Sequence, residues 1–68
     1  MATRLVDGMI VRGLPVTRQM QCMILGATSE GCSHASVAMW LHYWTNYTVR
    51  DCDRIVDCVV AVCVTNPN

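Results

Sequence analysis

The fold depends on residues 48–64, TVRDCDRIVDCVVAVCV. Apolar side chains recur in this stretch in alternating steps of three and four, which is the period of one helix face: Val49, Cys52, Val56, Val59 and Cys63. Thr48, with Asp51 three residues later, resembles a capping box in which Asp replaces Glu. We therefore predict a helix over residues 49–64.

The opposite side of this segment is charged. One-turn spacing predicts two ion pairs there, Arg50 with Asp53 and Arg54 with Asp57. A second interpretation stays open, because residues 55–64 are dense in β-branched side chains, which favour strands. The chain would then be a small α/β domain with a βαβ unit instead of a mostly α domain.

A second helix is expected over residues 34–46, with Ser33 or Ser36 as its N-cap. Val37, Leu41 and Trp44 would share one face. A second stripe adjoins it, formed by Trp40, Tyr43 and Tyr47. A helix that is apolar over so much of its circumference lies at the centre of a core or against a partner. We expect Trp40, Tyr43, Trp44 and Tyr47 to form an interface, with at least one Trp touching another chain.

Upstream, Pro15 is suited to the first turn of a helix over residues 15–25, which Gly26 would end as a C-cap. Residues 1–14 are expected to be a loosely ordered N-terminal arm or to include a short edge strand. Residues 15–68 would then form a single small domain.

Residues 26–33, GATSEGCS, are expected to be a loop. Gly26, Gly31 and Ser33 match the phosphate-binding pattern G-x4-G-K-[ST], except that Cys32 replaces the lysine. The loop therefore offers one alternative function, a small nucleotide- or anion-binding α/β module.

Composition points to a partner. The chain has 68 residues, of which 53% are hydrophobic and only 15% charged. So short a chain has too little interior to bury all of its hydrophobic side chains. Zero net charge argues against nucleic-acid binding, and the absence of lysine excludes Schiff-base chemistry on this chain. No apolar run is long enough to span a membrane, although peripheral membrane contact stays open. No export signal is recognisable, so an intracellular location is favoured.

The cysteines have a distinctive spacing. Nine residues separate Cys22 from Cys32, and ten separate Cys52 from Cys63. The spacing resembles the twin CX9C (coiled-coil-helix-coiled-coil-helix) family of the mitochondrial intermembrane space. The resemblance implies two antiparallel helices joined at both ends by disulfides Cys22–Cys63 and Cys32–Cys52. The alternative is that the cysteines are reduced and buried as small hydrophobic residues.

The residues do not predict catalysis or a metal site. Cys32 and His34 are the only local nucleophile and base, and their spacing does not place them side by side on a helix. No close pair such as C-x2-C supports structural zinc, and His34 and His42 are expected to be a surface residue and a helix-face residue. We expect a non-enzymatic structural or accessory subunit of a larger assembly, without a cofactor, that binds a protein partner or a second copy of itself.

Overall fold

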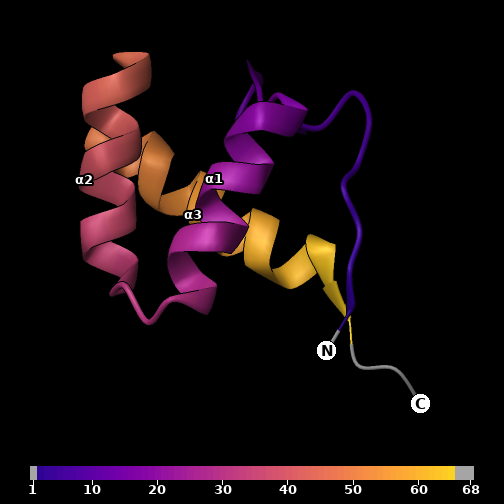
Figure 1. Ribbon diagram of the computed structural model, residues 1–68. Coiled ribbons are helices and arrows are strands. Elements are labelled where there is room, and N and C mark those ends of the chain that lie inside the picture. Colours follow the sequence, from indigo (N-terminus) through magenta and orange to yellow (C-terminus); the bar gives the residue numbers. More distant parts are fainter. Residues whose placement is uncertain (1, 66–68) are drawn as a thin grey trace.

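The computed structural model describes residues 2–65 and contains three helices, α1 (Arg18–Ser29), α2 (His34–Thr45) and α3 (Val49–Cys63) (Figure 1). Two small antiparallel sheets complete it: β1 (Ala2–Thr3) pairs with β4 (Val64–Thr65), and β2 (Ile10–Val11) pairs with β3 (Leu14–Pro15). The mostly helical prediction is confirmed. The βαβ alternative is wrong, because residues 55–63 are helical. Residues 66–68 of the predicted domain, like residue 1 of the arm, lie outside the described residues.

The core is built around α3, which packs against both other helices. Its predicted apolar stripe is buried at Cys52, Val56, Val59 and Cys63, whereas Val49 is exposed and Ile55 joins the core. The other helices and the amino-terminal segment supply the remaining buried hydrophobic residues: Met9, Val11, Val16, Met20, Ile24, Val37, Ala38 and Leu41. Thr48 caps α3 as predicted, accepting a hydrogen bond from the Asp51 N–H at 3.1 Å.

The first helix begins later than expected. Pro15 lies in β3, and the N-cap of α1 is Thr17, whose hydroxyl accepts a hydrogen bond from the Met20 N–H at 3.1 Å. The threonine hydroxyl satisfies a backbone N–H of the first turn that has no partner within the helix. The apolar pattern was nevertheless informative, because Val16, Met20 and Ile24 are all buried.

Gly26 does not end α1 as predicted. The helix continues to Ser29, and Gly31 follows its end with a φ of 89°, in the left-handed region that favours glycine. The Gly31 N–H donates to the Thr28 carbonyl and the Cys32 N–H to the Ala27 carbonyl, each at 3.1 Å. These two bonds form a Schellman motif, which satisfies the last carbonyls of the helix.

The amino-terminal arm contains the short strands that the sequence left open. Strands β2 and β3 are joined by Arg12 and Gly13, whose positive φ angles of 53° and 78° match a type I′ hairpin turn. Met9 and Val11 anchor the segment in the core. In Figure 1 the chain runs from β1, which lies beside β4 at the end of α3, along one side of the molecule to the hairpin.

Gln21 is the one buried polar residue among those described, with 0% of its surface exposed. Its amide nitrogen donates to the Val6 and Val16 carbonyls at 2.8 and 3.1 Å, and its carbonyl oxygen accepts from the Val6 N–H at 2.8 Å. The Cys63 thiol also faces that oxygen, at 3.6 Å. Gln21 therefore ties the amino-terminal segment to α1 beside the end of α3.

We predict that Gln21→Ala lowers the free energy of unfolding by at least about 1–3 kcal/mol, because that is the usual cost of one buried backbone group that loses its partner, here the Val16 carbonyl, and the part-buried groups of Val6 lose theirs as well. Urea denaturation followed by circular dichroism measures the change. Gln19→Ala is the matched control, since Gln19 is an exposed residue on the same helix. Equal effects of the two substitutions would contradict the proposed role of Gln21.

Candidate functional site

The outer face of α2 is the largest aromatic surface of the molecule. Ser33 caps this helix, and Val37, Ala38 and Leu41 bury its inner face. The outer face consists of Met39, Trp40, Tyr43 and Trp44, which are 52%, 49%, 88% and 46% exposed. At about 100° per residue, these four side chains fall within one arc of roughly 140°. They therefore form one continuous surface, which we call the α2 face.

Three of the four aromatic residues predicted for an interface belong to this surface. Trp44 was expected to share the core face of the helix, but it is about half exposed. Tyr47 lies after the helix, which ends at Asn46 in a left-handed conformation with φ 64°. The Tyr47 hydroxyl donates to the Pro15 carbonyl at 3.1 Å, so this side chain holds α2 and the hairpin together. Met39 belongs to the α2 face and was not predicted.

A hollow of about 380 Å³ lies beside Trp40. It is formed by the end of α1, the following loop and the first half of α2, and its lining residues are Ala27, Glu30, Cys32, Ser36, Val37 and Trp40. The α2 face is therefore not flat, because it has a depression next to one of its two indoles. The hollow forms where α1 and α2 pack together, and no local sequence pattern predicted it.

The predicted phosphate-binding loop has a different structure. Gly26 lies inside α1, and only residues 30–33 connect α1 to α2. The N–H groups of Glu30, Gly31 and Cys32 donate to carbonyls at the end of α1. These N–H groups are therefore occupied within the chain, whereas a phosphate-binding loop needs them free for the ligand. Ser33 is the N-cap of α2 and accepts a hydrogen bond from the Ser36 N–H.

All five cysteines, which lie among the described residues, are free thiols. Cys22 and Cys32 are exposed, Cys58 is half-buried, and Cys52 and Cys63 are buried. Cys22 lies in α1 but Cys32 lies beyond its end, so the first pair does not share one helix as the family resemblance implies. Burial raises the pKa of both the Cys52 and the Cys63 thiol.

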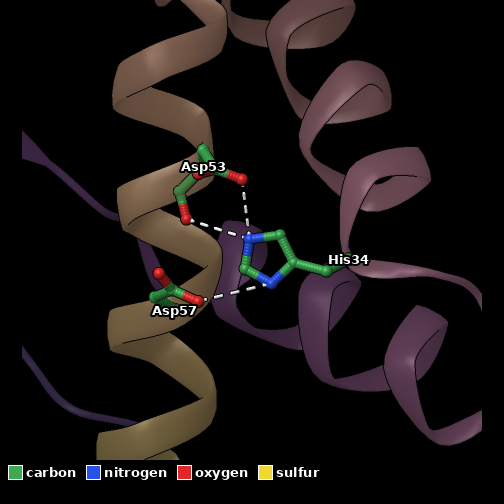
Figure 2. Close-up of side chains that lie close together, drawn as sticks. All are labelled: His34, Asp53 and Asp57. Atoms are coloured by element: carbon green, nitrogen blue, oxygen red, sulfur yellow. Dashed lines mark hydrogen bonds and ion pairs between the residues drawn. The ribbon is translucent and has the colours of Figure 1, made fainter.

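A polar cluster joins α2 to α3. Figure 2 shows the His34 ring, from the start of α2, between two carboxylates that lie one turn apart on α3. Its Nε2 atom lies 2.8 Å from an Asp53 carboxylate oxygen, and its Nδ1 atom lies 3.4 Å from one of Asp57. The carboxylates were predicted to pair with Arg50 and Arg54. That prediction is wrong, because both carboxylates pair with His34 in the part of the chain that the structure describes.

The spacing of the two aspartates already placed them on one face of α3, four residues apart. Nothing in the local sequence indicated that His34 would meet them, since this contact depends on how α2 packs on α3. His42, in contrast, is a helix-face residue as expected, and its Nδ1 atom contacts the Tyr47 carbonyl.

Comparison with known protein families, with curated proteins and with solved structures finds no match. Across residues 2–65, each helix is too short or too polar to cross a bilayer. The exposed aromatic and apolar residues of the α2 face indicate a binding surface.

We predict that Cys22 and Cys32 react rapidly with iodoacetamide in the folded, reduced chain, and that Cys52 and Cys63 react only after unfolding. Peptide mapping by mass spectrometry measures each site. The stapled alternative remains testable in the same experiment, because an untreated chain with two disulfides would show only one free thiol in denaturant.

The two buried thiols also predict a loss of stability in alkali. Their pKa values are raised in the folded state. Their contribution to the free energy of unfolding is therefore complete below the ordinary pKa of 9.0, and it is lost as the pH rises above that value. The midpoint of urea unfolding should therefore fall above pH 9.0 and should fall less in Cys52→Ala. An equal fall in both proteins would contradict this assignment.

Proposed function

We propose that this protein is a non-enzymatic structural subunit that associates through the α2 face. The observation that carries the proposal is the exposure of two tryptophans, a tyrosine and a methionine on one side of a single helix. Large exposed apolar patches usually mark interaction sites, and Trp and Tyr are the residues most enriched among those that dominate binding energy.

A second copy of the chain is the partner that this surface fits. Helix α2 contains no Asp, Glu, Lys or Arg. Two copies of helix α2 therefore meet without like-charge repulsion between the helices, and Glu30 is the charged residue among those that line the hollow beside them. A partner with a charged surface would gain nothing from this face, because no complementary charge is present on the helix.

The hollow beside Trp40 supports the same partner. In a two-fold symmetric dimer both copies use the same surface patch, so the hollow of each copy faces the α2 face of the other. An exposed side chain of one α2 face, such as Met39 or Tyr43, would enter the hollow of the other copy. Ala27 and Val37 supply its apolar lining, and Trp40 forms one edge.

We predict that the chain dimerises and that Tyr43→Arg abolishes the dimer. The substitution places two like charges in a desolvated interface, and it leaves the core intact because Tyr43 is 88% exposed. Sedimentation velocity over a concentration series measures the association. Tryptophan emission should also shift to shorter wavelength as the dimer forms and excludes water from the indoles.

Val62→Arg is the matched control, since Val62 is an exposed apolar residue on α3, outside the α2 face. This variant should dimerise like the unmodified chain. A folded monomer at every concentration, or equal weakening by Tyr43→Arg and Val62→Arg, would overturn association through this surface. A photo-crosslinker at position 43 that captures only a different protein, and never a second copy of the chain, would contradict the proposal that the partner is a second copy.

A further inference from the structure

The His34 cluster is independent of the α2 face and has its own chemistry. It offers one imidazole nitrogen and two carboxylate oxygens, and these ligand atoms lie within 4.8 Å of one another. His34 is the first residue of α2, whereas Asp53 and Asp57 lie on adjacent turns of α3. All three side chains are exposed (Figure 2). An ion from solvent therefore reaches the cluster without any opening of the fold.

A neutral His34 ring cannot satisfy both of its neighbours. Neutral imidazole carries one N–H and one nitrogen lone pair, yet both ring nitrogens face a carboxylate oxygen. In the neutral ring one contact is then a hydrogen bond, and the other places a lone pair against an anionic oxygen; only the protonated ring donates to both. A cation between these two atoms converts that repulsion into two attractive contacts.

The charge around the cluster also favours a cation. Two carboxylates on neighbouring turns of one helix repel each other. Arg50 and Arg54 lie on the same helix, but neither forms an ion pair within residues 2–65. The aspartates thus bring two negative charges to the site, and no arginine neutralises them by direct contact.

The ligand types identify the class of cation. Nitrogen and carboxylate oxygen together suit Zn²⁺ and related transition metals, whereas Mg²⁺ and Ca²⁺ prefer oxygen ligands alone. Two ligand atoms of a tetrahedral zinc ion lie about 3.4 Å apart, given bonds of about 2.1 Å. The three ligand atoms already lie within 4.8 Å of one another, and they belong to exposed side chains that have room to approach this spacing.

We propose that His34, Asp53 and Asp57 bind a divalent transition-metal ion such as Zn²⁺, which links the start of α2 to the middle of α3. Three protein ligands leave the fourth tetrahedral position to water. The site lies between two helices, so its formation depends on the tertiary structure.

The test uses the full-length chain with Cys22→Ser and Cys32→Ser, because exposed thiolates would otherwise compete for zinc. The chain has only two histidines, so their ring signals can be followed separately by NMR during titration with ZnCl₂. The His34 signals should shift and saturate near one equivalent. The His42 signals should not, and MgCl₂ should shift neither.

Asp53→Asn and Asp57→Asn should each weaken zinc binding at least about tenfold, since even partners outside the ligand shell contribute that much. Asp7→Asn is the matched control, because it removes an exposed carboxylate that pairs with Arg18 instead of His34. It should bind zinc with unchanged affinity. Failure of the His34 signals to shift at millimolar ZnCl₂, or equal affinity in all three variants, would overturn the proposal.

Discussion

The burial of one side of α3 is the interaction on which the rest of the structure depends. This helix alone contributes five buried residues, and it is packed against α1, α2 and the hairpin strand β2. Within residues 2–65 the structure has no second layer that could replace those contacts. The positions of α1 and α2 are therefore fixed largely by how their apolar faces meet the same buried stripe.

The same constraint explains the exposed face of α2. A helix packed on α3 from one side buries only the residues of that side, here Val37, Ala38 and Leu41. Its remaining aromatic residues face outward because none of the elements described in residues 2–65 covers them. Apolar surface of this kind is stabilised when another molecule removes it from water, which connects the size of the domain to its proposed role as a subunit.

Polar groups are organised by the same packing. Gln21 satisfies backbone groups of the amino-terminal segment, and every fully buried side-chain nitrogen or oxygen among the described residues has a partner. The Arg12 side chain holds the hairpin turn to α3 through Asp51 at 2.6 Å, and this hydrogen bond lowers the pKa of the Asp51 carboxyl. The His34 cluster joins α2 to α3 in a corresponding way, because the ring lies against the carboxylates of Asp53 and Asp57 and the Asp53 carbonyl.

The sequence by itself determined the elements that depend on local chemistry. The apolar repeat in steps of three and four predicted α3 and most of its buried side. Thr48 and Ser33 identified the starts of α3 and α2. Both signals could be read from the sequence because a repeat and a cap involve residues that are close in the chain. The excess of aromatic residues on α2 likewise indicated an interface.

Tertiary structure decided the rest. Helix α1 ends at Ser29 instead of before Gly26, and the added turn includes Ala27, which packs against the core. The partners of Asp53 and Asp57, the role of Tyr47 and the hollow beside Trp40 all involve residues at least ten positions apart. Such contacts depend on the packing of whole helices, which no local pattern encodes.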